Sequence, residues 1–559
     1  MSVYQSRPWL ALYDPGKPSD ITHEYASALD MFRASVGRSP DTQIIRYFDG
    51  VVTLRELDEL SDAFACALVD RGFRRGDRLA VYLQNVPQFL ISMVATWKAG
   101  GVMVSVNPMN KERELELLLT DSGSKVLVCH ESLYGSVARN VLDRTKVELV
   151  VTTSELEYQT RNDPRLFKGV ERARHDGTED MAELIAAHRG MTPPPVDLGK
   201  DDVAFLTYTS GTTGPPKGAM GTHGNVVFNA QTYRDWCEVG PDDVIFGVAP
   251  LFHVTGLIAH IALALLIPAP LVLAYRFDTG AVIEAIREHR ATFTVGSITV
   301  FIAMMNHPDV NPEDLATLTT IYSGGAPVPP STVKQFQEKF GHRIRNIYGL
   351  TETTSPSHGA PLGREEPVDP TSGALSVGVP IFNTIVRIVD DDGNELPPGE
   401  IGELVTEGPQ VVIGYWEKPE ETARALPGGR LYTGDVGFMD EQGWFYIVDR
   451  KKDMIIAGGY KVWPREVEDV LYEHAAVREA GVVAVTDPYR GETVKAFVSL
   501  KPGKTATEKE LIDFSKQRLA AYKYPRIVEI VDEIPKTVTG KILRRELRTR
   551  EAGTAEPVR

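Results

Sequence analysis

The segment TSGTTGPPKG, residues 209–218, decides how this sequence is interpreted. It carries three glycines, four hydroxyl side chains and one lysine, and it directly follows residues 203–208, an apolar run typical of a buried strand. Glycines let backbone N–H groups approach anionic oxygens, hydroxyls add short hydrogen-bond donors, and Lys217 supplies a positive charge. The segment therefore predicts a phosphate-binding loop. It is not a Walker A loop, because Pro216 precedes Lys217 and Gly218 follows it.

Segments upstream of this loop alternate between helical and strand-like patterns. Apolar residues recur at helical spacing from Leu54 to Leu68, and Gly72 then precedes a strand-like run. Such alternation is typical of parallel sheets with helical crossovers, so it predicts an α/β fold with parallel-type sheets. Residues 154–202 are polar and contain prolines, and we expect them to form a surface excursion. The expected pairs are helix 54–68 with strand 79–83, helix 88–98 with strand 102–106, and a helix from Glu112 with strand 125–129.

The pattern changes downstream of the loop. Short strand-like runs separated by turn sequences occupy residues 377–448 and predict a β-rich subdomain, and a compact α+β unit follows. We therefore expect an N-terminal domain over residues 1–448, a boundary at 449–453 and a C-terminal domain over 454–559. The expected elements are strands 384–389, 403–407 and 444–448, then helix 464–473, strands 482–485 and 494–500, and helix 508–519.

Composition narrows the class of protein. The chain has 559 residues, 60 basic and 76 acidic side chains and a formal charge of -16. This acidity argues against a nucleic-acid partner, which would require a basic face. Three cysteines are too few for a disulfide framework, and the N-terminus lacks the features of a signal peptide, so we expect a cytoplasmic protein.

One apolar stretch, residues 257–275, is long enough to span a bilayer by hydropathy alone. His260 interrupts it, and Pro268 and Pro270 would break a continuous helix near its middle. A buried helix followed by a core strand is the better interpretation, and no transmembrane segment is expected.

Five further motifs accompany the loop. They are SGGAP at 323, YGLTE at 348, YTGD at 432, DRKKDMIIAGGYKV at 449 and PKTVTGKILRREL at 535. Together with TYTSGTTGPPKGAM they resemble, in the same order, the motifs of the adenylate-forming superfamily. This superfamily holds acyl-CoA synthetases, firefly luciferases and the adenylation domains of nonribosomal peptide synthetases. The resemblance covers nearly the whole chain. It implies a large N-terminal domain and a small mobile C-terminal domain with the active site between them.

The implied reaction is attack of a carboxylate on the α-phosphate of ATP, which forms an acyl-adenylate and expels pyrophosphate. The resemblance assigns Tyr348 to the face of adenine, Asn346 to its amino group and Thr351 to the α-phosphate. Asp435 and Arg450 are assigned to the ribose hydroxyls. The full set of implied ATP- and AMP-binding residues is Thr209, Ser210, Gly211, Thr212, Thr213, Gly214, Lys217, Gly324, Gly325, Ala326, Asn346, Tyr348, Gly349, Thr351, Asp435 and Arg450.

Two residues are implied to be catalytic. Glu352 matches the family's magnesium ligand, and a hard carboxylate beside phosphate oxygens is the kind of ligand that Mg²⁺ takes. Lys541 matches a lysine whose ammonium bridges the carboxylate and the α-phosphate, aligning both and neutralising developing charge.

The resemblance also implies a second half-reaction, in which the small domain rotates and the acyl group is transferred to a thiol. Lys452 falls at the implied hinge, and Gly458 and Gly459 resemble the loop that lines the passage for the pantetheine arm of coenzyme A. A plain hairpin turn is the alternative interpretation of these glycines.

The sequence identifies the acid substrate less precisely than it identifies the nucleotide. PLFHVTGL at 250 resembles the motif that bounds the acyl pocket, which implies His253, Val254 and Leu257 as pocket residues, although His253 could also be a core histidine. Amino-acid activators commonly place an aspartate near this motif, and residues 250–257 contain none. The apolar residues favour a medium- or long-chain fatty acid or another hydrophobic acid, with coenzyme A as acceptor.

Several alternatives stay open at this point. An aryl acid such as a cinnamate or benzoate is the closest competitor, and a sterol-derived acid and acyl transfer to a carrier protein are others. A nucleotide-binding regulator without turnover is a different class, which retention of Lys541, Glu352 and Asp435 together disfavours. The sequence leaves a homodimer and peripheral membrane contact undecided.

Overall fold

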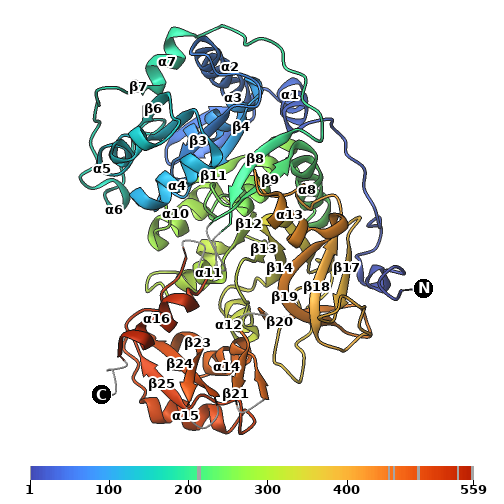
Figure 1. The fold of residues 1–559 in the computed structure, drawn as a ribbon. Helices are drawn as coiled ribbons and strands as arrows, with labels where there is room; N and C mark the ends of the chain where they lie inside the picture. Colours follow the sequence, from blue (N-terminus) through green and yellow to red (C-terminus); the bar gives the residue numbers. More distant parts are fainter. Residues whose placement is uncertain are drawn as a thin grey trace.

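The computed structural model describes residues 2–209, 216–450, 453–457, 460–487, 491–537 and 541–554, with the side chains of 450, 461, 491 and 551–554 left out. A large N-terminal part, blue to orange in Figure 1, lies above a small C-terminal part in orange-red. The large part contains two sheets flanked by helices and a third, smaller sheet beside them. This arrangement confirms the predicted α/β class with a β-rich subdomain and a small α+β C-terminal unit.

A seven-stranded sheet in the order β7-β6-β5-β3-β4-β8-β9 forms the first half of the large part. All its neighbouring strands are parallel except β8 and β9. Its strands are β3 (Arg78–Tyr82), β4 (Val102–Ser105), β5 (Val126–His130), β6 (Leu149–Thr153), β7 (Glu179–Asp180), β8 (Val203–Tyr208) and β9 (Gly218–Thr222). Its helices are α2 (Leu54–Asp70), α3 (Pro87–Lys98), α4 (Glu112–Ser122), α5 (Glu131–Ser136), α6 (Pro164–Phe167) and α7 (Met181–Ala187). The three predicted helix and strand pairs are confirmed.

The expected surface excursion at residues 154–202 is more ordered than its composition indicates. Its β7 pairs in parallel with β6 at the edge of the sheet, and its α7 packs beside α2. Met181 and Leu184 of α7 are buried. Main-chain pairing and these few apolar side chains fix the segment, and its polar composition concealed both.

A nine-stranded sheet in the order β16-β15-β14-β13-β12-β10-β11-β1-β2 forms the second half. Its strands are β1 (Gln43–Tyr47), β2 (Gly50–Thr53), β10 (Ile245–Phe246), β11 (Leu271–Leu273), β12 (Phe293–Gly296), β13 (Thr320–Ser323), β14 (Ile344–Leu350), β15 (Ser355–Gly359) and β16 (Val379–Pro380). Its helices are α1 (Ala28–Arg38), α8 (His223–Trp236), α9 (Leu263–Leu266), α10 (Thr279–His289), α11 (Ile298–Met305) and α12 (Pro330–Phe340).

The apolar stretch at 257–275 lies in the core of this half. It forms a π-helical segment, η4 (Gly256–Ala262), then α9 and β11, as the helix-then-strand interpretation predicted. In the described part of the chain, no helix combines the length and apolar character needed to cross a membrane. Short 3-10 segments elsewhere are η1 (Pro8–Leu12), η2 (Ala138–Asn140), η3 (Leu142–Arg144), η5 (Pro312–Leu315), η6 (Thr351–Thr353) and η7 (Pro427–Gly429).

The β-rich subdomain is a four-stranded antiparallel sheet of β17 (Ile385–Val389), β18 (Gly402–Glu407), β19 (Leu431–Met439) and β20 (Phe445–Arg450), with α13 (Pro419–Ala425) beside it. The strand β19, which carries Asp435, is absent from the sequence-based expectation. Its glycines and its YTGD motif interrupt the apolar alternation that identified the other strands.

The C-terminal part contains β21 (Ile455–Ala457), β22 (Tyr460–Val462), α14 (Pro464–Tyr472), β23 (Val477–Asp487), β24 (Gly491–Leu500), α15 (Glu508–Lys516), β25 (Ile527–Ile530) and α16 (Arg544–Thr554). Its apolar side chains form a cluster of their own around Val467, Leu471 and Val482. The boundary expected at 449–453 falls between the last strand of one sheet and the first strand of the next. Residues 451 and 452 lie outside the described residues, so the boundary and the mobility of the domain stay predictions.

Three histidines of the large part are completely buried, namely His223, His260 and His358. Burial lowers the pKa of His223 and of His260 to about 4, and that of His358 to about 3. Nε2 of His260 accepts a hydrogen bond from the backbone N–H of Ala249 at 3.2 Å, which requires an unprotonated nitrogen. These rings are therefore neutral in the folded protein at neutral pH.

Acidification is expected to destabilise the protein through these histidines. In the unfolded chain each ring takes up a proton below pH about 6.5, whereas in the folded chain it stays neutral down to its lowered pKa. Unfolding therefore binds protons in this interval, and the free energy of unfolding falls as pH is lowered, by up to about 1.4 kcal/mol per pH unit for each histidine. Calorimetric unfolding midpoints at pH 7.5 and 5.5 would check this, and His358→Gln should reduce the difference. An equal or higher midpoint at pH 5.5 would contradict it.

Candidate active site

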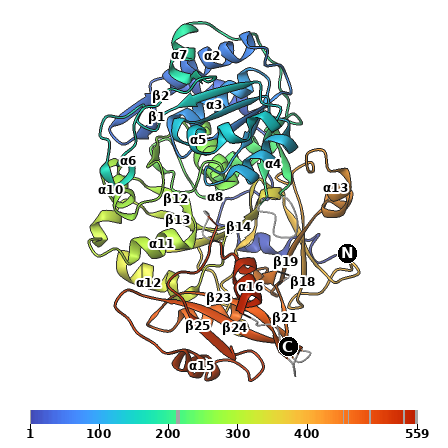
Figure 2. The ribbon, with the colours of Figure 1, turned by 60° about the vertical axis from the view of Figure 1, so that its left-hand side comes forward.

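A cavity of about 1260 Å³ opens between the two parts of the chain. Its walls come from the loops after β8, β12 and β14, from the start of β19, and from the C-terminal segment that ends at Lys541. Figures 1 and 2 show the C-terminal part lying beneath the large part in both views, with α16 directed toward the junction. Among the predicted site residues, those that line the cavity are Thr209, Lys217, Gly324, Gly325, Tyr348, Gly349, Thr351, Glu352, His253, Val254 and Lys541.

The base of the predicted phosphate loop is a β-hairpin. β8 and β9 pair through Tyr208 and Gly218, and the N–H of Thr209 donates to the carbonyl of Lys217 at 3.0 Å. A Cβ atom at Gly218 would lie 3.2 Å from the ring of Tyr208, so a larger residue would press on this pairing. The hairpin therefore brings Thr209 and Lys217 to the same place on the cavity wall. Ser210, Gly211, Thr212, Thr213 and Gly214 lie outside the described residues.

Glu352 is held at the cavity wall by a tyrosine. The hydroxyl of Tyr415 donates to Oε1 of Glu352 at 2.7 Å, and Nζ of Lys217 lies 5.1 Å from the centre of the Tyr415 ring. Burial, reinforced by the charge of Glu352, raises the pKa of Tyr415 well above its ordinary value, so the phenol remains a donor. Tyr415 thus joins the phosphate-loop lysine to the predicted metal ligand. Sequence analysis did not identify it, because a tyrosine outside the recognised motifs resembles any core tyrosine.

The donors near Glu352 fit a magnesium ion. Glu352 offers a carboxylate and its neighbour Thr351 a hydroxyl, both at the cavity wall. Within the described ranges, no cluster of three or more histidine, cysteine, aspartate or glutamate side chains could hold a metal ion by itself. This matches the way Mg²⁺ usually binds, through one or two carboxylates, waters and the phosphates of a nucleotide.

The predicted ribose and adenine residues meet at the strand β14. Tyr348 lines the cavity, and its hydroxyl donates to Oδ2 of Asp435 at 2.7 Å. Asp435 is 3% exposed and lies opposite Arg450 in the pairing of β19 with β20. Gly324 approaches β14 closely, since a Cβ atom there would lie 2.5 Å from the carbonyl oxygen of Ile347. The structure therefore brings Tyr348, Asp435 and Gly324 together, whereas the side chain of Arg450 is not described.

Besides Asp435 and Arg450, three predicted residues are not among the described residues that line the cavity. Asn346 is buried, and its Nδ2 donates to the carbonyl of Ser376 at 3.0 Å, behind the cavity wall. Ala326 packs against the apolar cluster that contains Phe301 and Phe336. Leu257 is fully buried in the main core. Each carries a side chain directed into packing, which motif matching alone does not reveal.

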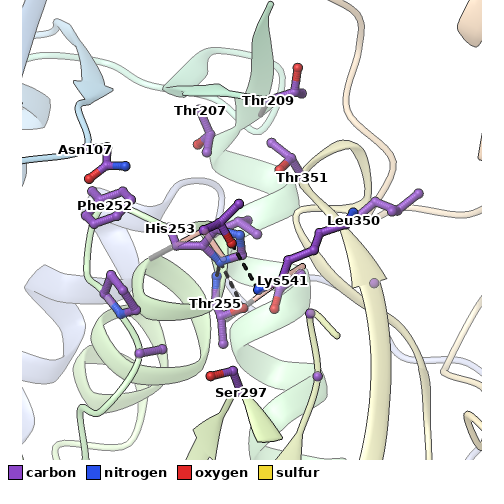
Figure 3. Close-up of a pocket in the computed structure, with 18 of the residues that line it drawn as sticks. Asn107, Thr207, Thr209, Phe252, His253, Thr255, Ser297, Leu350, Thr351 and Lys541 are labelled. Atoms are coloured by element: carbon purple, nitrogen blue, oxygen red, sulfur yellow. Dashed lines mark hydrogen bonds between the residues drawn. The ribbon is translucent and has the colours of Figure 1, made fainter. Parts of the chain in front are cut away.

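Four described residues of the C-terminal part line the cavity, namely Glu533, Lys536, Thr537 and Lys541, and Lys541 is the one that the sequence analysis predicted. The N–H of Thr537 donates to the carbonyl of Lys541 at 2.8 Å, and the N–H of Lys541 donates to the hydroxyl of Thr537 at 3.1 Å. Burial, together with the positive charge of Lys541, lowers the pKa of His253 to about 4. Lys541 therefore lies close enough for its charge to act on the imidazole of His253, and Figure 3 draws both side chains in the same region of the cavity as Thr255.

The predicted acyl side of the cavity carries several apolar side chains. His253 and Val254 line it, and Nδ1 of His253 accepts a hydrogen bond from the N–H of Thr255 at 3.3 Å. His253 is therefore a cavity residue and not only a core residue. Further apolar residues of this wall, which the sequence analysis did not name, are Val248, Phe252, Val295, Val300 and Ala303. They come from segments far apart in the chain, and no local pattern groups them.

Comparisons with known proteins identify the family of the chain. Residues 32–416 match the AMP-binding enzyme family, and residues 466–541 match the AMP-binding enzyme C-terminal domain. A long-chain-fatty-acid–CoA ligase from Bacillus subtilis (strain 168) is 37% identical over 565 residues and covers 98% of each chain. A feruloyl-CoA synthase from Amycolatopsis sp is 36% identical and covers 92% of this chain and 96% of the relative.

Solved structures give the same result. A crystal structure of the anthranilate CoA ligase AuaEII in complex with anthranoyl-AMP superposes with a TM-score of 0.86, at 25% identity, over 96% of this chain and 99% of that one. ATP-bound MatB from Rhodopseudomonas palustris gives a TM-score of 0.82, at 29% identity, over 94% and 99% of the two chains. Fold and site thus define an adenylate-forming enzyme, as the motifs predicted. The chain belongs to the AMP-binding enzyme family.

Proposed function

We propose that this chain is an AMP-forming acid–CoA ligase acting on a medium- or long-chain fatty acid or another hydrophobic acid. In the first step a carboxylate oxygen of the acid attacks the α-phosphorus of ATP, and the bond from that phosphorus to the β-phosphate oxygen breaks. Pyrophosphate leaves and the acyl-adenylate forms. In the second step the thiol sulfur of coenzyme A attacks the acyl carbon, the bond to AMP breaks, and the thiol loses its proton.

The position of Lys541 carries this proposal. A lysine from the C-terminal part reaches a cavity whose other walls hold a phosphate-loop hairpin and an apolar side. Lys541 lines the cavity together with His253, on whose imidazole its charge acts, and we place it at the border between the acyl wall and the nucleotide wall. A positive charge at that border neutralises charge that develops between carboxylate and α-phosphate, and it holds the two reactants in line.

The remaining residues take supporting roles in this proposal. Lys217 and Thr209 hold the phosphates, Tyr348 lies against the base, and Asp435 accepts hydrogen bonds from the ribose hydroxyls. Glu352, oriented by Tyr415, would hold Mg²⁺, which when bound offsets the negative charge of the phosphates. Coenzyme A is the proposed second substrate, and Lys452, Gly458 and Gly459 keep their proposed roles at the hinge and the thiol passage, outside the described residues.

The apolar wall supports a hydrophobic acid. Burial of each methylene group contributes about 0.8 kcal/mol to binding, so the valines at 248, 254, 295 and 300 favour an alkyl chain. The B. subtilis relative bears the name of a long-chain-fatty-acid ligase, in line with this choice. An aryl acid is the second candidate, because the feruloyl-CoA synthase is similar over nearly the same length.

An acid panel tests the function. Purified protein would be assayed for ATP–pyrophosphate exchange with octanoate, palmitate, benzoate and ferulate, and then for thioester after coenzyme A is added. We expect exchange with the fatty acids and acyl-CoA only when coenzyme A is present. Higher kcat/KM for ferulate would favour the aryl acid, and exchange without thioester would favour a carrier-protein acceptor. Exchange with none of the acids would favour the nucleotide-binding regulator.

We further propose that the protein works in the cytoplasm, where its substrates ATP and coenzyme A are available. Sedimentation velocity would test self-association to a homodimer. Flotation with liposomes containing palmitate would test peripheral contact with a membrane that supplies the acid.

A further inference from the structure

The two parts of the chain meet at the first turn of α14. This helix begins at Pro464, and Arg465 follows. The backbone N–H of Arg465 donates to Oδ2 of Asp449 at 3.1 Å, and its Nη1 donates to the carbonyl of Ile447 at 3.0 Å. Both acceptors lie on β20 of the large part, and Figure 1 shows α14 next to that strand. Arg465 of the C-terminal part thus donates two hydrogen bonds to β20, the last strand of the large part.

The strand that receives these bonds is fixed in the large part. Asp449 pairs with Val436, and Ile447 pairs with Gly437, in the antiparallel pairing of β19 with β20. The last residue of the expected boundary is instead fixed to the C-terminal part, because Oδ1 of Asp453 accepts from Arg548 of α16 at 2.8 Å. The contacts of Arg465 therefore cross from one body to the other.

The junction is buried and charged. Arg465 is 4% exposed and Asp449 is 5% exposed, so water screens their interaction little. Nε of Arg465 lies 3.5 Å from Oδ2 of Asp469, one turn further along α14. Within the described residues, Nε and Nη2 of Arg465 lack a hydrogen-bond partner, although the guanidinium is buried. A buried guanidinium that lacks some of its hydrogen bonds can specify one orientation of the C-terminal part. The missing hydrogen bonds keep the free energy that stabilises this orientation moderate.

Hydrogen bonds within the C-terminal part link the helix of Arg465 to the helix that follows Lys541. Its helix α14 carries Glu468, which accepts two hydrogen bonds from Nη2 of Arg544, at 2.8 Å and 2.7 Å. Glu468 also accepts from the N–H of Val482 on β23 at 2.8 Å, so α14, α16 and the sheet form one body. Arg544 begins α16, three residues after Lys541. The orientation of α14 on β20 therefore determines where Lys541 lies.

We propose that Arg465 is a positioning residue that holds the C-terminal domain in the orientation that places Lys541 in the cavity. The inference rests on the proposed function, in which adenylate formation needs this orientation and thioester formation needs another. It assigns to Arg465 an effect on the first half-reaction alone. The residue contacts neither the cavity nor the proposed reactants, so it acts only through the placement of Lys541.

Single-turnover measurements of the two half-reactions test this role. In Arg465→Met the rate of adenylate formation should fall about tenfold, because the competent orientation is populated less. Thioester formation from supplied acyl-adenylate should stay within about twofold of the wild type. Arg465→Lys should recover part of the first rate, since a lysine keeps one donor and the charge. The control is Arg518→Met, since Arg518 is exposed and pairs with Glu473 inside the C-terminal part. It should leave both rates unchanged.

A measurement of domain orientation does not depend on turnover. Lys334 of α12 and Lys509 of α15 are exposed, whereas all three native cysteines are buried. Spin labels at Lys334→Cys and Lys509→Cys would report the distance between the two parts by pulsed electron paramagnetic resonance. We expect one dominant distance with intact Arg465 and a second population in Arg465→Met.

The outcomes separate the inference from the proposed function. An unchanged distance distribution, or equal losses in both half-reactions with a lowered unfolding temperature, would overturn the positioning role. A wild-type protein that activates no acid would overturn the proposed function, and the distance measurement would still decide the role of Arg465.

Discussion

Lys541→Ala is expected to reduce adenylate formation by ~10²-fold or more, because the variant lacks the charge that stabilises the transition state between carboxylate and α-phosphate. The same variant should form thioester from supplied acyl-adenylate at close to the wild-type rate, since the proposed rotation of the C-terminal domain would move Lys541 away from the cavity. Rapid-quench measurement of each half-reaction in turn separates the two effects.

Arg545→Ala is the matched control for this variant. Arg545 is an exposed cation only four residues along the chain, outside the residues that line the cavity. It should leave both half-reactions unchanged. Equal loss of both half-reactions in Lys541→Ala would contradict the assigned role and would indicate a general loss of structure.

The second large effect is expected for Glu352→Gln. The amide keeps the size of the side chain and an oxygen that can accept from Tyr415, whose bond to Glu352 is 2.7 Å long. It removes the negative charge that favours a hard cation. We expect adenylate formation to fall by about 10²-fold, in the range found when one electrostatic contact to a transition state is lost, and the Mg²⁺ concentration for half-maximal rate to rise.

Titration of Mg²⁺ at fixed ATP measures this second effect. Glu420→Gln provides the control, since Glu420 is an exposed carboxylate of α13 that does not line the cavity. A Glu352→Gln variant with unchanged Mg²⁺ dependence would show that Glu352 acts through Tyr415 and Lys217 and not through a metal ion.

Local patterns in the sequence predicted most of the helices and strands of the fold. Helical spacing from Leu54 to Leu68 and the runs after Gly72 predicted the parallel sheet, because burial of one face fixes the period of apolar residues. The strand β19 escaped prediction, since Gly434 and Asp435 interrupt its apolar alternation. The strand β7 was not predicted for a related reason. Main-chain pairing at the edge of a sheet does not depend on a particular pattern of side chains.

The residues of the site also fall into two groups, those that the sequence could predict and those that it could not. Residues inside motifs, such as Lys217, Tyr348 and Glu352, could be predicted because their chemistry is local. Tyr415 could not, because its role depends on a contact with a residue from a distant segment. The approach of Lys541 to His253 likewise depends on how two separate parts of the chain dock, and the same holds for Arg465 on β20.

In the proposed mechanism, a change in the docking of these parts would let one cavity support two reactions. Among the described residues, the contacts that hold the present orientation include the two buried hydrogen bonds from Arg465 to β20. Loss of these contacts would free the C-terminal domain without disturbing the sheets that carry Tyr348 and Glu352. The nucleotide side would stay fixed while the domain that supplies Lys541 turns.

An oxygen-isotope experiment tests the central claim most directly. The protein would be incubated with ATP, coenzyme A and palmitate labelled with oxygen-18 in both carboxylate positions, and the products would be analysed by mass spectrometry. Attack of the carboxylate on the α-phosphorus predicts AMP that carries one oxygen-18 atom, together with palmitoyl-CoA. Unlabelled AMP, or ADP in place of AMP, would contradict adenylate formation by this chain.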